Sequence, residues 1–262
     1  MASKGQNLWS RRETLAALHV YMQLPFGQLH SKNHLIKQLA EWIGQTSNSV
    51  ALKLVNFASL DPQIIASGRK GMGNASQLDR SIWADLNHHW TSITLEAATE
   101  YEHLAAGHGV SPIADIESDL QEESLIVHEG KTRSAVVQVR INQARFRKAV
   151  LASYNNTCCI SGLRHSKLVI ASHIVPWSVD KENRLNPRNG LCLSAIHDRA
   201  FDQGLLTVGP DGLIVLSEEL RKIKTTSAFA EVLVACDGRP LQKPERFAPN
   251  PEFLKWHREK YL

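Results

Sequence analysis

The sequence predicts an α+β protein, with a helical domain in its N-terminal part and a small unit of strands and one helix in its C-terminal part. In the first hundred residues, apolar side chains recur at the spacing of amphipathic helices. From about residue 155 onward, short β-rich runs alternate with polar turns. The apolar fraction of 43% and the charged fraction of 21% are ordinary for a globular chain with a sizeable core.

The charge distribution marks a boundary inside the chain. Residues 114–129 contain six acidic side chains and no Lys or Arg, whereas residues 131–148 contain six Lys or Arg and no acidic side chain. Such a reversal indicates units with different roles. We therefore expect a helical domain over 1–106, a partly flexible linker over 107–134 and a second domain over 135–262.

Three helices are expected early in the chain, over residues 11–24, 34–44 and 49–60. The last two are joined by a short polar turn, which is the pattern of a helix-turn-helix unit. In that interpretation the second helix enters a DNA major groove, with Lys53 and Asn56 facing outward. The alternative is a plain helical hairpin, because antiparallel helices joined by short loops are common.

A fourth helix is expected over 141–154, because Phe146, Val150 and Tyr154 recur every fourth residue and form one apolar stripe. The side chains on and near its opposite face are basic, which is typical of a surface that meets a polyanion. The candidate DNA contacts there are Arg140, Arg145 and Lys148.

The segments that follow are short and predict a compact α+β unit. They are a strand over 167–175, a polar loop over 178–190, a strand leading into a helix over 191–202, and a hairpin over 205–216 around Pro-Asp-Gly.

Composition restricts the class of protein. The net charge of +4 is compatible with a nucleic-acid partner without establishing one. No apolar run reaches the roughly 18 residues of a membrane span, and the first residues lack the apolar stretch of a secretory signal, so we expect a cytoplasmic protein without membrane contact. Four cysteines without a CxxC pair indicate buried, reduced thiols.

Three polar residues of the C-terminal unit suggest hydrolytic chemistry. His173 interrupts an apolar strand, Asn189 precedes the next strand, and His197 lies on the helix that follows. Phosphodiester hydrolysis needs a general base near neutral pKa, which histidine supplies. It also needs a cation for the phosphate charge and a group that orients the base. A strand, a loop and a helix packed together would bring these three residues into one volume.

The same residues lie within motifs of a known family. The segments SGL, LVIASHIVPW and NPRNGLCLSAIHDRAFDQGLLTV, within residues 140–220, resemble the HNH endonucleases, and in particular a subgroup with SHI-PW, NGL-L and H---FD motifs that is frequent among bacterial restriction-type proteins. The resemblance implies a ββα-metal fold. It also implies that His173 is the general base, that Asn189 stabilises the loop and orients His173, and that His197 is a metal ligand.

The chain departs from many members of that family in two ways. Ser172 stands before the base, where relatives have Asp or His as a second metal ligand. Asp202 or Asp198 can complete the site, and Asp202 is the first choice because it falls in the FD motif. The two Cys pairs that hold a structural zinc in relatives are absent, so the fold must rest on apolar packing, with Trp177, Leu191, Leu193 and Phe201 as candidates.

We therefore expect a metal-dependent endonuclease that hydrolyses phosphodiester bonds in double-stranded DNA and uses Mg²⁺, or alternatively Mn²⁺. The resemblance implies a restriction or modification-dependent restriction enzyme. Segments of residues 24–80 resemble the helical region that precedes the nuclease in this subgroup, which implies target recognition or dimerisation. A homodimer is expected because cutting two strands needs two sites or two nicks. The alternatives are a non-catalytic DNA-binding regulator on a degenerate nuclease scaffold and, more remotely, a nuclease toxin.

Overall fold

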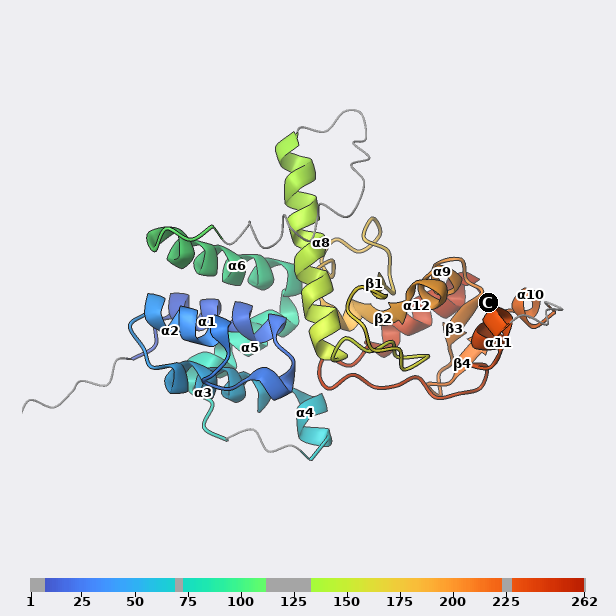
Figure 1. Cartoon of the computed structure of the whole chain (residues 1–262), viewed down its shortest axis with the longest axis horizontal. Helices are drawn as coiled ribbons and strands as arrows, with labels where there is room; N and C mark the ends of the chain where they lie inside the picture. Colours follow the sequence, from blue (N-terminus) through green and yellow to red (C-terminus); the bar gives the residue numbers. More distant parts are fainter. Residues whose placement is uncertain (1–7, 69–72, 112–132, 223–227, 262) are drawn as a thin grey trace, which may run out of the picture. The chain divides into compact units, whose positions relative to one another are not determined.

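The computed structural model describes residues 8–68, 73–111, 133–222 and 228–261, and it divides into two compact units, 1–145 and 146–262 (Figure 1). It is an α+β structure, as predicted: helices dominate, and the strands form two small antiparallel sheets in the second unit. The linker predicted over 107–134 coincides largely with residues 112–132, which lie outside the described residues.

The first unit is helical throughout its described residues. Its core is built on α1, whose buried residues include Leu15, Leu18 and Tyr21 and which packs on α6 and α3. Apolar side chains at this spacing bury one face of a helix and so hold the bundle together. The elements are α1 (Arg11–Gln23), η1 (Phe26–Gln28), α2 (His34–Trp42), α3 (Ser47–Ala58), α4 (Pro62–Ala66), α5 (Gln77–His88) and α6 (Trp90–Gly107).

The ends of these helices follow from local chemistry. Ser10 caps α1 in a reciprocal capping box with Glu13, so two backbone N–H groups that lack helical partners are satisfied. Thr46 caps α3 through its hydroxyl. Gly44 follows α2 with a φ of 65°, a left-handed conformation that costs glycine little.

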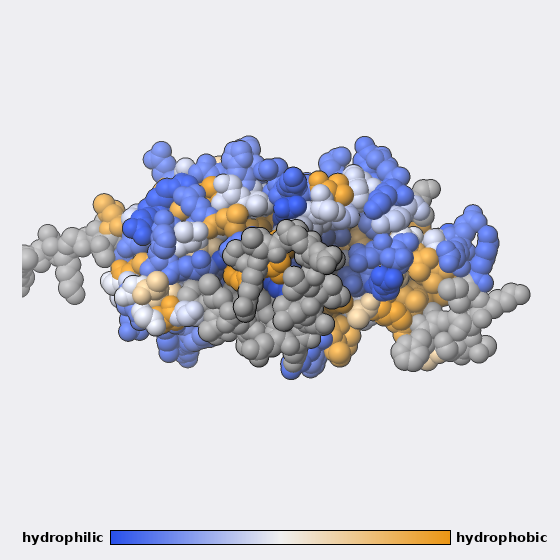
Figure 2. Space-filling model, turned by 90° about the horizontal axis from the view of Figure 1, so that it is seen from above, coloured by the Kyte–Doolittle hydropathy of each residue, from blue (hydrophilic) through white to orange (hydrophobic). Residues whose placement is uncertain are grey.

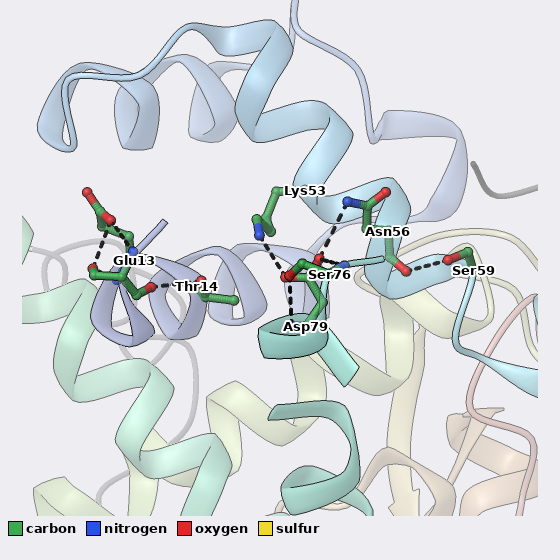
Figure 3. Close-up of polar contacts among 8 residues, drawn as sticks. Glu13, Thr14, Lys53, Asn56, Ser59, Ser76 and Asp79 are labelled. Atoms are coloured by element: carbon green, nitrogen blue, oxygen red, sulfur yellow. Dashed lines mark hydrogen bonds and ion pairs between the residues drawn. The ribbon is translucent and has the colours of Figure 1, made fainter. Parts of the chain in front are cut away.

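A buried polar cluster joins α3 to α5. The Lys53 Nζ donates to the Asp79 Oδ1 at 2.7 Å, and the Asn56 Nδ2 donates to the Asp79 Oδ2 at 3.5 Å (Figure 3). Asp79 also accepts from the backbone N of Ser76 in the capping box of α5. We call Lys53, Asn56 and Asp79 the α3–α5 clasp.

The expectation that Lys53 and Asn56 face outward is wrong. Their exposed fractions are 6% and 8%, because both side chains turn inward to the carboxylate of Asp79. The exposed positions of α3 include Asn48 and Leu52, and no cation of this helix reaches solvent. Helix α3 is therefore a core helix of a helical hairpin, and its solvent-facing side offers no basic contact to a DNA groove.

The second unit begins with the last part of α8 (Arg133–Ser153) and continues as strands and short helices. Strand β1 pairs antiparallel with β2, in a register that sets His173 opposite Gly190, and β3 pairs antiparallel with β4. Helix α9 packs on β1 and β2. The elements are β1 (Val169–His173), η2 (Pro187–Asn189), β2 (Gly190–Ser194), α9 (Ala195–Asp202), β3 (Leu206–Val208), β4 (Ile214–Leu216), α10 (Glu218–Arg221), α11 (Ala228–Val234) and α12 (Pro251–Tyr261).

The core of the second unit is mainly apolar. Leu191, Leu193 and Phe201 are fully buried, as expected, whereas Trp177 is partly exposed. The four cysteines are free and buried, which confirms the expectation of buried thiols. On the face seen in Figure 2, apolar residues appear as patches between hydrophilic ones. Among the described residues, no helix combines the length and apolarity needed to cross a membrane.

Candidate active site

The candidate site is built on the β1–β2 hairpin. His173 ends β1, and the backbone N of Ile174 donates to the Asn189 carbonyl at 3.0 Å, which prolongs the ladder by one step. The chain then leaves the sheet in a loop that returns through η2 to β2. The imidazole of His173 therefore projects from a strand end that is held by backbone hydrogen bonds on its partner strand.

One nitrogen of the His173 imidazole is fixed by the loop. The Nε2 atom lies 3.0 Å from the carbonyl oxygen of Arg184. Because a carbonyl only accepts, Nε2 carries the proton, and the lone pair is left on Nδ1. Nδ1 makes no hydrogen bond to the residues that the structure describes. The tautomer of a proton acceptor is thus set by a backbone group.

Aromatic rings surround the same imidazole. The ring of Phe146, on α8, stacks on it with centroids 3.6 Å apart and planes 13° apart. The ring of Trp177 meets it edge-on at 5.6 Å. Burial lowers the pKa of His173 to about 4, and the Arg184 carbonyl opposes that shift. At neutral pH the imidazole is therefore uncharged and has a free lone pair, and burial makes it a weaker proton acceptor than a free histidine.

Asn189 holds the loop that carries these contacts. Its Oδ1 accepts from the backbone N of Val175 at 2.8 Å, and its Nδ2 donates to the Val175 carbonyl at 3.0 Å. The same Nδ2 lies 3.4 Å from the Asn183 carbonyl. Asn189 is fully buried, so water cannot bond to the backbone groups near His173. The two ends of the Asn189 amide supply those hydrogen bonds instead. The amide contacts the backbone next to the histidine and not its ring.

His197 lies among sulfur and hydroxyl groups. It is fully buried, with Nδ1 2.7 Å from the Ser194 Oγ and 3.9 Å from the Cys158 Sγ. Although burial alone would lower the pKa of His197, the thiols of Cys158 and Cys236 raise it to about 9. His197 in turn lowers the pKa of Cys158 to about 6, against the effect of burial. We call Cys158, Ser194 and His197 the thiol–imidazole cluster.

Oxygen donors gather near a different side of α9. Asp198 and Asp202 are four residues apart, so they share one face of the helix. Burial raises the pKa of Asp198, and Ser172 and Arg199 oppose this. Burial and the neighbouring Asp198 charge raise the pKa of Asp202. His197 points about 100° away from Asp198 and about 140° away from Asp202 around an ideal helix.

The Ser172 hydroxyl is an unsatisfied polar group beside these carboxylates. Ser172 is 3% exposed, and its Oγ makes no hydrogen bond within the part of the chain that the structure describes. It is nonetheless close enough to Asp198 to favour the charged carboxylate. No group of three or more His, Cys, Asp or Glu among the described residues is arranged to hold a metal ion.

The basic residues of α8 do not form one uniform surface. The Arg145 guanidinium pairs with Glu102, and its Nη1 also donates to Asn142, so its charge is neutralised and only 9% of its side chain is exposed. The expected exposure of Arg145 is therefore wrong. Arg140 and Lys148 are half-exposed, and their contact with DNA stays a prediction.

Sequence reasoning missed two features of this site. Apolar spacing identifies Phe146 only as part of a stripe, because spacing does not say which residue a ring will cover. The sequence only weakly indicates the thiol–imidazole cluster. Ser194 precedes His197 by about one helical turn, which suggests a contact, but Cys158 is distant in sequence.

The comparison with known families covers the same segment. Residues 158–209 match the profile of a family described as HNH endonuclease, and this range contains β1, β2, α9 and β3. No curated protein matches the chain. The predicted family is confirmed, while the subgroup is not resolved by the match. Residues 158–209 of the chain therefore match the HNH endonuclease family.

Proposed function

We propose that the protein is a metal-dependent endonuclease that hydrolyses phosphodiester bonds in double-stranded DNA, with His173 as the general base. The observation that carries the proposal is the imidazole whose Nε2 is bound to the Arg184 carbonyl while Nδ1 has no hydrogen-bond partner among the described residues. A water placed at Nδ1 would lose its proton to this nitrogen as it attacks phosphorus. Asn189 keeps the loop, and with it the Arg184 carbonyl, in place.

The oxygen donors near Ser172 fit a hard divalent cation better than His197 does. Mg²⁺ prefers carboxylate, hydroxyl and water oxygens, whereas thiol and imidazole groups suit softer metals. We therefore propose that Asp198 and Asp202 hold the metal and that His197 serves the thiol–imidazole cluster. The Ser172 hydroxyl supports this choice, because it favours the charged form of Asp198, which is the form that binds a cation. When bound, the cation would stabilise the charge on the phosphate and the leaving oxygen.

The test of the base is cleavage of supercoiled plasmid with Mg²⁺ or Mn²⁺, with EDTA as the quench. We expect His173→Ala to lower the cleavage rate by about a hundredfold to ten-thousandfold, the range for a lost general base. His165→Ala, an exposed histidine of the same unit, is the matched control. Cleavage by a folded His173→Ala protein at the wild-type rate would refute the assignment.

The metal assignment has a readout that does not depend on cleavage. Titration of Mn²⁺ into the protein, followed by water-proton relaxation, should show weaker binding for Asp198→Asn and Asp202→Asn. His197→Gln should bind the ion as the wild type does. The reverse pattern would return His197 to the role of metal ligand that the resemblance implied.

Asn189 gives a second prediction about the loop. Asn189→Ala removes the two bonds to Val175 and should cost about 2 kcal/mol of stability, at about 1 kcal/mol for each bond. The rate should fall because the Arg184 carbonyl is no longer held. Urea unfolding and cleavage rates, measured on the same preparations, check both effects. Full activity at reduced stability would confine Asn189 to a structural role.

The biological role that we propose is restriction or modification-dependent restriction, by a homodimer. It rests on the sequence resemblance to restriction-type proteins and on the need to cut two strands. Cleavage of modified and unmodified plasmid, with end sequencing and sedimentation analysis, tests it. Tight DNA binding without nicking under any divalent metal would favour the alternative of a non-catalytic regulator, which Ser172 in the usual ligand position keeps open.

A further inference from the structure

The proposed base, His173, contacts a residue that lies outside the segment matched by the HNH family, residues 158–209. Phe146 precedes Cys158, where the matched residues begin, and it belongs to α8. Its ring is buried, with an exposed fraction of 2%, and stacks almost parallel on the His173 imidazole at 3.6 Å. A stacked arrangement covers one face of the imidazole and leaves its edges, which carry the nitrogens, uncovered.

The close approach of α8 depends on a missing side chain. Gly190 faces His173 across the hairpin. A Cβ at this position would lie 2.5 Å from the Val150 Cγ2 and 2.9 Å from the Phe146 Cζ. The φ of Gly190 is −135°, which any residue adopts, so the glycine is needed for space and not for its backbone. The sheet thus leaves room for the ring that covers the base.

The ring restricts the one rotation that the other contacts leave open. The Arg184 carbonyl holds Nε2 from one edge, and Trp177 approaches from another. A single hydrogen bond defines a direction but still allows the ring plane to tilt about it. The parallel face of Phe146 fixes that plane, and so fixes the direction of the Nδ1 lone pair.

We propose that Phe146 is a positioning residue for the nuclease reaction: its stacked ring sets the plane of the His173 imidazole and thereby aims Nδ1 at the attacking water. The inference rests on the proposed role of His173 as the base. It makes α8 part of the catalytic unit, although this helix lies outside the family segment.

The first arm of the test removes the ring. Phe146→Leu keeps an apolar side chain but loses the aromatic face. We expect kcat to fall about tenfold to hundredfold, as for a misaligned catalytic group, with KM for plasmid within about twofold of wild type. In proton NMR spectra the His173 ring protons should lose the upfield ring-current shift from Phe146. His257, stacked on Phe201 at 3.7 Å, is the internal reference whose shifts should not change.

The second arm disturbs the same contact from the opposite side. Gly190→Ala keeps the ring but crowds both Val150 and Phe146, so the ring shifts and kcat should again fall while KM is kept. Val150→Ala loosens the packing of α8 without touching the ring, and it is the control for lost stability. It should keep the wild-type kcat once rates are corrected for the folded fraction measured by circular dichroism. Phe146→Met replaces Phe146→Leu if the latter does not fold.

The outcomes separate the two proposals. Wild-type kcat in a folded Phe146→Leu protein that has lost the ring-current shift would overturn the positioning role. The positioning role would also be overturned if Phe146→Leu and Val150→Ala lost the same amount of kcat after correction for the folded fraction, because the loss would then reflect packing alone. If His173→Ala itself remains active, the proposed base fails, and this is visible before any Phe146 variant is measured.

Discussion

Two histidines of the second unit make the same kinds of contact, except at Nδ1. His173 and His257 each stack on a phenylalanine and each donate Nε2 to a backbone carbonyl. Burial lowers the pKa of both to about 4. The difference is at Nδ1, which in His257 lies 2.8 Å from the Thr207 hydroxyl and so accepts its hydrogen bond. A buried histidine with both nitrogens satisfied is structural, whereas one with an open Nδ1 can react.

His257 gives a prediction about acid stability. Its folded pKa lies below the unfolded value of about 6.5, so its contribution is complete above that pH and is lost as the pH falls toward 4. Urea unfolding of His257→Gln should show less loss of stability between pH 7 and pH 4.5 than the wild type, by about 1–3 kcal/mol. His165→Gln, at an exposed position, should follow the wild type. Identical pH slopes for wild type and His257→Gln would contradict the assignment.

At the scale of elements, α3 and α5 are joined by a buried charge pair. Lys53 and Asp79 have side-chain exposures of 6% and 0%, so neither charge is solvated by water. Such an ion pair adds little stability compared with an apolar contact of similar size. Removing one partner, however, leaves the other charge buried and uncompensated. The clasp therefore fixes how the two helices meet and explains why Lys53 is unavailable to DNA.

The clasp predicts a non-additive pair of substitutions. Lys53→Met leaves the Asp79 carboxylate buried without its cation and should destabilise the first unit by about 3–5 kcal/mol. Adding Asp79→Asn should recover part of this loss, because the buried charge is removed. Urea unfolding of the single and double variants measures the coupling. Lys37→Met on the exposed face of α2 should change stability by less than about 0.5 kcal/mol. Additive effects would contradict the pairing.

At the scale of the whole molecule, α8 supplies both the ring on His173 and part of the core of the second unit. Val150 on this helix is fully buried, and a Cβ on Gly190 would meet it. The segment that matches the HNH family begins after α8 ends and therefore lacks this packing. We infer that the second unit needs more chain than the family segment provides.

Fragments of different length test this requirement. A fragment of residues 133–262 should unfold cooperatively and nick plasmid with Mn²⁺, since it keeps Phe146 and Val150. A fragment of residues 158–262 should lack a cooperative transition, because the apolar surface covered by α8 is exposed. Circular dichroism and plasmid nicking measure the two properties. A folded, active short fragment would show that α8 is dispensable.

Periodicity and turn chemistry predicted the first three helices and the strands of the second unit, whereas no separate helices were predicted for α5 and α6. The helix over 11–24, the strand and helix over 191–202 and the hairpin over 205–216 were expected and occur within one or two residues. They form because apolar spacing and the Pro-Asp-Gly turn act locally. For the same reason, the sequence placed His173 on a strand and Asn189 just before the next one, where the structure has the end of η2.

Orientation could not be predicted in the same way. Lys53 turned inward because Asp79, distant in sequence, offers a partner in the core. His197 and Asp198 are adjacent and both polar, so composition alone could not say which faces the thiols and which faces the oxygen donors. Long-range contacts decide such cases, and a single sequence does not contain their geometry.

The continuity of α8 has a consequence for tolerated changes in chain length. Arg145, paired with Glu102, closes the first unit, and Phe146 opens the second, so consecutive residues serve different neighbours. One inserted or deleted residue inside this helix would change its angular phase by about 100° on one side of the lesion. An insertion between Phe146 and Val150, which both face Gly190, would keep only one of these two side chains against β2, whereas the same insertion in an exposed loop would be absorbed.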